Sequence, residues 1–263
     1  MDKINDSWAQ SDSYDYFMGR WSKLMAPVFL DWVKAPESSK WLEIGCGTGA
    51  LSEAIVHSAN PNQLTSIDPS ELFLEKAKER LQGKGEFIVG DASKLSFQEN
   101  SFDIIVSGLA LNFFPNIEKA LSEMKRVIKP NGTIAAYVWD YSGRIDMIRY
   151  FWDAAFKMDP NSRDLDEGIR FPICTEKHLK KTVQKAGLSN VETSTLDIIT
   201  HFKDFDDYWS PFLGGQGPAP GYLASLSNPL QEQLRNKVYS LLPFEKDGSI
   251  KILGRAIAVK ANA

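Results

Sequence analysis

Residues 41–52 read WLEIGCGTGALS, a short and mostly apolar run that opens onto a glycine-rich turn. The run from Trp41 to Ile44 predicts a buried strand, and Gly45, Gly47 and Gly49 follow at every second position. Glycine costs stability, so this density indicates a turn where something approaches the backbone closely. The spacing also satisfies G-x-G-x-x-A, a dinucleotide fingerprint between a strand and a helix. By itself the pattern does not decide between a dinucleotide, another ligand and a turn without a ligand.

Short apolar runs alternate with helical patterns on both sides of this turn. The best helix pattern has apolar residues at the helical period over 117–129 and ends at Pro130-Asn131-Gly132. Another covers 71–81, with Ser70 as its expected cap. Such alternation predicts an α/β fold with a doubly wound, mostly parallel sheet. Its expected strands are Trp41–Ile44, Leu64–Ile67, Phe87–Val89, Ile104–Ser107 and Ile134–Trp139.

The second half of the chain is less regular. Helices are expected over 144–157, 176–186 and 227–242, and strands over 191–200 and 250–260. The Pro- and Gly-rich stretch 210–222 predicts a loop. We therefore expect one domain, 1–263, in which N-terminal helices (1–39) precede the ligand-binding core (40–139). A late strand with a helical lid (140–249) and a final antiparallel strand (250–263) follow.

Composition narrows the class of protein. The chain has 263 residues, a net charge of -4 and no cluster of Lys and Arg, so nucleic acid is not an expected partner. Its N-terminus is polar and no apolar run approaches the length of a membrane span, so stable membrane insertion is not expected either. With only two cysteines a disulfide framework is excluded, and we expect a cytoplasmic protein. No two histidines have metal-ligand spacing, so no metal is predicted.

The surroundings of the glycine turn favour an adenosine ligand with a cationic tail. Asp68 ends the second strand about 20 residues further on, where a carboxylate accepts hydrogen bonds from ribose hydroxyls. Glu43 precedes the turn, which is unfavourable for pyrophosphate but acceptable for an ammonium or sulfonium group. After the third strand, Asp91 can accept a bond from an adenine amino group and the Ala92 amide can donate to a ring nitrogen.

Five motifs in order resemble those of class I S-adenosylmethionine-dependent methyltransferases. They are E-x-G-C-G-T-G (43–49), I-D-P-S (67–70), G-D-A (90–92), F-D-I-I-V-S (102–107) and L-S-E-M-K-R-V-I-K-P-N-G (121–132). The similarity covers about residues 40–139 and is greatest to the small-molecule branch with the quinone-biosynthesis C-methyltransferases. The segment YDYFMGRWS (14–22) resembles the one that many of these enzymes fold over the cofactor.

The resemblance implies a seven-stranded Rossmann-like sheet in the order 3-2-1-4-5-7-6, with helical lid insertions. It also implies methyl transfer from S-adenosylmethionine to a small molecule by in-line displacement. The aromatic residues of the lid half favour a partly apolar or aromatic acceptor, and we expect a monomer or homodimer. The residues that it places against the cofactor are Tyr16, Arg20, Glu43, Gly45, Cys46, Gly47, Gly49, Asp68, Pro69, Asp91, Ala92, Ser107, Gly108 and Leu109. Arg20 would pair with the cofactor carboxylate while Tyr16 closes the site.

The sequence supports catalytic residues less directly than it supports cofactor-binding residues. Many relatives have histidine where this chain has Asn112, so a histidine base cannot be assumed there. Asp140, after the fifth strand, is a general base, a hydrogen-bond partner of the substrate or a turn cap, with the cap favoured, and His201 is a lone candidate base. Aromatic residues crowd the lid half, as core or as the lining of an acceptor pocket. Two alternatives stay open: an NAD(P)-dependent oxidoreductase, for which no catalytic pair is found, and a non-catalytic cofactor-binding protein.

Overall fold

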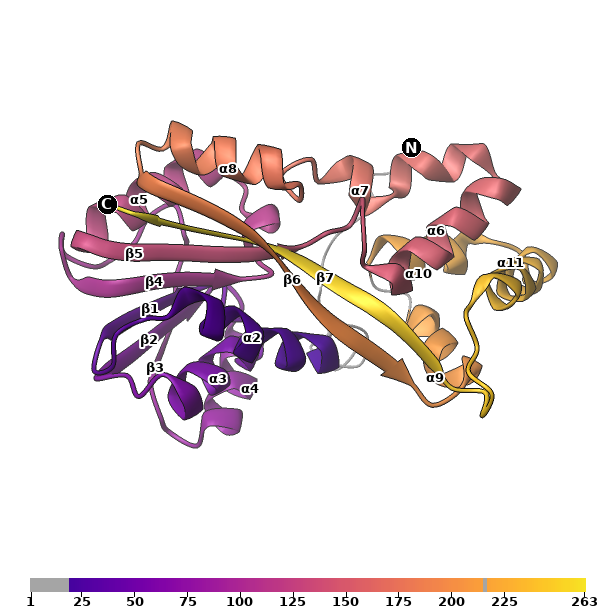
Figure 1. Ribbon diagram of the computed structural model, residues 1–263, viewed down its shortest axis with the longest axis horizontal. Coiled ribbons are helices and arrows are strands. Elements are labelled where there is room, and N and C mark those ends of the chain that lie inside the picture. Colours follow the sequence, from indigo (N-terminus) through magenta and orange to yellow (C-terminus); the bar gives the residue numbers. More distant parts are fainter. Residues whose placement is uncertain (1–18, 215–216) are drawn as a thin grey trace. The chain divides into compact units, whose positions relative to one another are not determined.

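Seven strands form a single sheet in the order β3-β2-β1-β4-β5-β7-β6, which confirms the expected order. The computed structural model describes residues 19–214 and 217–263 (Figure 1). Its strands are β1 (Lys40–Ile44), β2 (Gln63–Asp68), β3 (Glu86–Val89), β4 (Phe102–Gly108), β5 (Ile128–Trp139), β6 (Ser189–Phe202) and β7 (Ile250–Asn262).

The strands β1 to β5 pair in parallel, and β7 runs antiparallel to β5. The strand β1 lies between β2 and β4, with Trp41 opposite both Leu64 and Ile104. Parallel strands end at the same edge of a sheet, so the loops that follow β1, β2, β3 and β4 are brought together there. These are the loops that carry most of the candidate ligand-binding residues.

Helices cover both faces of the parallel part of the sheet. In Figure 1, α5 (Ile117–Val127) and α8 (Glu176–Lys185) lie on one face, and α2 (Arg20–Val33), α3 (Ala50–Ser58) and α4 (Glu71–Leu81) on the other. The apolar stripe of α5 is buried against the sheet, as its period predicts. The expected cap of α4 is confirmed, because Ser70 Oγ accepts a hydrogen bond from the Phe73 amide.

The junction between α5 and β5 differs from the sequence prediction. The helix ends at Val127, and β5 begins at Ile128, before Pro130-Asn131-Gly132. Phe102 pairs with Ile128, whereas Ile104 pairs with Thr133, so residues 129–132 interrupt the register of the two strands. Local periodicity extends the helix through Lys129, but pairing with β4 decides where the strand begins. Asn131 has φ 64°, the left-handed conformation that asparagine tolerates.

The chain divides into two compact units. The sheet unit comprises residues 22–139, 173–196 and 256–263. The helical unit comprises residues 19–21, 140–172 and 197–255 of the described chain. The boundary after Trp139 coincides with the end of the predicted ligand-binding core, whereas the sequence predicts a single domain.

The helical unit is built around an aromatic core. Its elements are α6 (Asp146–Met158), η3 (Pro160–Leu165), α7 (Glu167–Arg170), α9 (Phe205–Trp209), η4 (Ser210–Gly214), α10 (Pro218–Ser225) and α11 (Asn228–Leu241), with parts of β6 and β7. Phe151 and Phe212 stack with ring centroids 4.7 Å apart, and Tyr208 Oη donates to the Met147 carbonyl. These aromatic side chains therefore form core, which was one of the two interpretations of the sequence.

The prediction of a loop over 210–222 is wrong, because η4 and α10 occupy most of it. Pro218 stands in the first turn of α10, where a missing amide hydrogen costs nothing. Proline and glycine therefore stand at the start of a helix here, and their presence does not by itself indicate a loop. Within the described ranges, no helix has both the length and the apolar character needed to cross a membrane.

Candidate functional site

The glycine turn joins the end of β1 to the start of α3 and is tied to β2. The amides of Gly45 and Cys46 both donate to the Ile67 carbonyl, at 2.8 and 3.1 Å, and the Gly49 amide donates to the Cys46 carbonyl at 2.9 Å. Two successive amides on one carbonyl hold the turn against the neighbouring strand. The loop is thereby fixed at the carboxyl edge of the sheet.

The glycines of this turn differ in what surrounds them. A Cβ on Gly49 would lie 3.0 Å from Ala77 Cβ, and one on Gly45 would lie 2.5 Å from Ala110 Cβ. Tight packing therefore explains why both positions are glycine. A Cβ on Gly47 would meet nothing within 4 Å, although its φ is +54°. At Gly47 the turn therefore faces open space. This is the position where a ligand can approach the backbone.

Asp68, the last residue of β2, binds the turn and the start of α4 with its two carboxylate oxygens. Oδ2 accepts from the Gly47 amide and Oδ1 from the Ser70 amide, both at 2.9 Å. Burial raises the pKa of Asp68, and the two amide bonds oppose that shift. Each oxygen has a second lone pair, so the carboxylate can still accept from two hydroxyls.

Glu43 is buried beneath the turn. Its carboxylate accepts hydrogen bonds from Ser52 on α3 and, at 3.2 Å, from Ser66 on β2. Burial raises the pKa of Glu43 from 4.5 to about 8, with Asp68 contributing to the rise. The sequence alone predicts an anion beside the turn at this position. In the structure Glu43 is mostly protonated at pH 7 and joins β1, β2 and α3.

Asp91 and Ala92 follow β3 at the same edge. The Asp91 carboxylate is exposed, and its Oδ1 accepts from the Ser93 amide and hydroxyl, both at 2.8 Å. These bonds lower the pKa of Asp91. Two apolar side chains at this edge, Leu72 and Val89, are 45% and 51% exposed. Sequence reasoning missed them, because no local pattern tells an exposed apolar residue from a buried one.

The segment after β4 combines backbone strain with unpaired polar atoms. Leu109 has φ +59°, a conformation that is uncommon for residues with a Cβ. On either side of it, Ser107 Oγ and Asn112 Nδ2 are buried and have no hydrogen-bond partner. Buried polar groups are normally paired, and exceptions of this kind are typical of ligand sites.

Cys46 and Pro69 complete the candidate residues of this edge. The Cys46 side chain is buried, and burial raises the pKa of its thiol well above 9, chiefly because the thiolate would lose its hydration. It is therefore a small unreactive residue in the turn, as its size suggested. Pro69 is exposed between Asp68 and Ser70.

Arg20 lies in the helical unit and is held by three neighbours. Its Nη1 donates to Asp207 Oδ1 at 2.9 Å, and the guanidinium stacks over the rings of Trp21 and Phe202. Its Nε and Nη2, and the indole nitrogen of Trp21, are buried without a hydrogen-bond partner. Three adjacent donors thus lack an acceptor. Tyr16, the other candidate of the N-terminal segment, lies outside the described residues.

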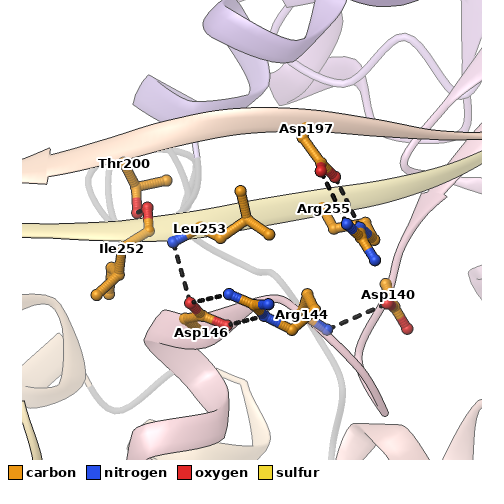
Figure 2. Close-up of polar contacts among 8 residues, drawn as sticks. All are labelled: Asp140, Arg144, Asp146, Asp197, Thr200, Ile252, Leu253 and Arg255. Carbon is orange, nitrogen blue, oxygen red and sulfur yellow. Dashed lines mark hydrogen bonds and ion pairs between the residues drawn. The ribbon is translucent and has the colours of Figure 1, made fainter.

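Asp140 caps a turn in the helical unit, as Figure 2 shows. Its Oδ2 accepts from the Arg144 amide at 3.1 Å, and a Cβ on Gly143 would lie 2.1 Å from that oxygen. Burial raises the pKa of Asp140. This geometry is that of the turn cap favoured by the sequence. Nearby, Asp146 pairs with Arg144 and also accepts from the Leu253 amide.

The remaining histidine candidate is exposed. His201 lies on β6 between the buried residues Thr200 and Phe202, so its side chain is on the opposite face of the strand. Thr200 Oγ1 donates to the Ile252 carbonyl of β7 at 2.8 Å, which fixes that alternation (Figure 2). Among the described residues, no group of three His, Cys, Asp or Glu side chains could hold a metal ion.

Known proteins match this chain in sequence and fold. Residues 42–136 match the family described as Methyltransferase domain. A demethylmenaquinone methyltransferase of Staphylococcus aureus is 29% identical over 168 residues, which cover 59% of this chain and 70% of the relative. The YcgJ protein of Bacillus subtilis has a TM-score of 0.58 at 16% identity, over 91% of this chain and 97% of its own. Phosphoethanolamine N-methyltransferase 2 of Haemonchus contortus, solved with S-adenosyl-L-methionine, has a TM-score of 0.58 at 15% identity, over 99% of this chain and 58% of its own.

The sheet order, the glycine turn and the match of residues 42–136 to the Methyltransferase domain family give this chain a close resemblance to class I S-adenosylmethionine-dependent methyltransferases. Within that class the chain resembles the quinone methyltransferases. The match to the Methyltransferase domain family lies within the sheet unit, which also holds most of the candidate cofactor residues.

Proposed function

We propose that this enzyme transfers the methyl group to a small acceptor with an apolar or aromatic body, by in-line displacement. The observation that carries the proposal is the open side of Gly47, next to the carboxylate of Asp68 and above the start of α3. The positive φ of Gly47 favours glycine by itself, and the free space beside Asp68 leaves room for a ligand to reach the backbone. When bound, S-adenosylmethionine supplies an electrophilic methyl carbon on sulfur, so the protein's task is alignment and exclusion of water.

Each part of the cofactor has a matching part of the sheet edge. The turn at Gly45, Cys46, Gly47 and Gly49, with the unpaired amides of the first turn of α3, suits the amino-acid end, and no side chain caps that helix. Asp68 suits the ribose, and Asp91 with Ala92 suits the adenine edge. Leu72 and Val89 would cover the faces of the ring, which accounts for their exposure. Ser107, Gly108 and Leu109 would form the floor, with Pro69 beside the ribose.

Arg20 remains our candidate for the cofactor carboxylate. Its unpaired Nε and Nη2 form the edge that binds a carboxylate with two parallel hydrogen bonds, and Trp21 adds a third donor. A selective test compares two ligands. Arg20→Gln should weaken binding of S-adenosylhomocysteine but leave 5′-methylthioadenosine, which lacks the amino acid, unchanged. An equal loss of affinity for both ligands would show that Arg20 does not bind the cofactor carboxylate.

No general base is assigned. Asn112 is an amide and cannot accept a proton at neutral pH, Asp140 is engaged as a turn cap, and His201 is exposed on β6. The acceptor atom would therefore be nucleophilic already or carry an acidic proton that passes to solvent. Buried Ser107 Oγ and Asn112 Nδ2 are available to hydrogen-bond a ligand at this place. The quinone-type name of the relative from Staphylococcus aureus supports an aromatic acceptor.

Calorimetric titration with S-adenosylhomocysteine tests the cofactor site. We expect micromolar binding that Asp68→Ala weakens by at least about tenfold, since hydrogen bonds to a charged group are lost. Asp68→Asn, which keeps the size and one acceptor, should lose less. Absence of binding, or stronger binding of NADH, would contradict the proposal and favour an oxidoreductase. Binding without methyl transfer to any member of a quinol and phenol panel would favour a non-catalytic binding protein.

A further inference from the structure

The helical unit contains a cavity of about 440 Å³ that shares no residue with the candidate cofactor site. Its walls come from one face of α6, from η3 and α7, and from the turn at Ser142 and Gly143. Its volume is in the range of small-molecule sites, roughly 300–1,000 Å³. The cavity is thus large enough for an organic ligand.

One wall of the cavity is fixed by a paired arginine. Arg149 donates to both carboxylate oxygens of Asp166, at 2.9 and 2.6 Å, and to the Tyr141 carbonyl at 2.8 Å. Asp166 also accepts from the Gly168 amide at 2.8 Å. These bonds neutralise the charge of Arg149 and hold α7 against α6. The pair is therefore part of the frame, and neither member is free to bind an ion.

The charge available to a ligand comes from Arg163 on η3. Its guanidinium lies 5.4 Å from the centre of the Phe156 ring, and no carboxylate of the described residues forms an ion pair with it. The opposing charge in the lining is Asp153 on α6, which is exposed and precedes Lys157 by one helical turn. With one free cation and one exposed anion, the cavity suits a ligand with a single negative charge rather than a dianion.

The apolar part of the cavity is exposed to an unusual degree. Phe156 on α6 and Ile169 on α7 both line it and are 41% and 49% exposed, whereas Phe151 and Trp152 on α6 are buried. Trp152 also lines the cavity, and its Nε1 donates to Glu167 Oε2 at 2.5 Å. Apolar side chains left exposed beside a cavity are typical of a binding surface.

From this arrangement we infer that the cavity binds a planar apolar molecule with one anionic group. The ring system lies against Phe156 and Ile169, and the anionic group lies beside Arg163. An arginine stacked on an aromatic ring presents its edge to an oxyanion while its face stays covered. The inference does not rest on the proposed function, because every residue that carries it belongs to the helical unit.

The test uses two fluorescent probes with related ring systems. The anion 8-anilinonaphthalene-1-sulfonate should bind one saturable site, and the neutral N-phenyl-1-naphthylamine should bind the same site more weakly. Arg163→Gln should weaken the binding of the anionic probe by about fivefold, which is the upper range for an exposed charge contact. It should weaken the binding of the neutral probe by less than about twofold. Phe156→Ala should weaken both probes. Lys157→Gln, an exposed neighbour that does not line the cavity, serves as the matched control.

All variants are compared by thermal unfolding, and exposed positions were chosen so that folding is retained. Saturating S-adenosylhomocysteine is added in a parallel titration. Displacement of the anionic probe by that ligand would place the probe in the cofactor site and overturn the inference. So would wild-type affinity in both Arg163→Gln and Phe156→Ala, or the lack of a saturable site in the wild type. None of these results would contradict the proposed cofactor site, because calorimetry measures cofactor binding separately.

Discussion

Replacing Glu43 by glutamine should make the protein more resistant to alkaline pH. The carboxyl group is buried, is hydrogen-bonded to Ser52 and Ser66, and has its pKa raised by burial from 4.5 to about 8. A pKa raised in the folded state means that the stabilising contribution is complete below the unfolded pKa. It is lost as the pH rises through the folded pKa. Glutamine keeps the shape and the hydrogen-bonding capacity but does not titrate.

The size of the effect follows from the two pKa values. One pKa unit corresponds to about 1.4 kcal/mol, so a shift from 4.5 to about 8 corresponds to about 5 kcal/mol in total. Most of that lies between the two pKa values, and linkage assigns about 3 kcal/mol to the interval from pH 6 to pH 9. The stability of Glu43→Gln relative to wild type should therefore rise by about that amount over this interval. Water that enters around the ionised group would reduce the figure.

Urea unfolding of both proteins at pH 6, 7, 8 and 9 measures this difference directly. Glu71→Gln, at an exposed position in the first turn of α4, is the control and should give a constant difference across the series. If the difference for Glu43→Gln changed by less than about 1 kcal/mol, ionised Glu43 would not carry the burial cost assumed in the linkage relation. The assignment of a protonated Glu43 at pH 7 would then be wrong.

Three further predictions use the same structure. Gly47→Ala and Gly83→Ala both place a side chain at positive φ in open space, so each should cost about 1 kcal/mol of stability. Only Gly47→Ala should also weaken the binding of S-adenosylhomocysteine measured by calorimetry, by about tenfold. Burial raises the pKa of Glu167 to about 7. The unfolding free energy of Glu167→Gln relative to wild type should therefore rise by about 2 kcal/mol between pH 5 and pH 8 in urea unfolding. A stability difference that does not change with pH would contradict this. Gly143→Ala, whose Cβ would meet Asp140 Oδ2 at 2.1 Å, should lower the stability by about 1–3 kcal/mol in thermal unfolding, and an unchanged transition would show that the turn can move.

Local patterns were sufficient for much of the fold. The alternation of apolar runs with helical stripes predicted the parallel strands, and Ser70 was found as the cap of α4 from its residue type alone. The start of β5 was missed because Ile128 is decided by pairing with Phe102, which is distant in sequence. The helix α10 was missed because proline and glycine are common both in loops and at helix starts.

The candidate site shows the same division. The sequence by itself determined which residues stand at the carboxyl ends of the strands, since a parallel sheet must bring those ends to one edge. Only the tertiary structure decided that Gly47 faces open space while Gly45 packs on Ala110, and that Glu43 is mostly protonated at pH 7. The physical reason is that free space, desolvation and hydrogen bonding depend on atoms contributed by segments far apart in the chain. A residue's type and spacing carry no record of those neighbours.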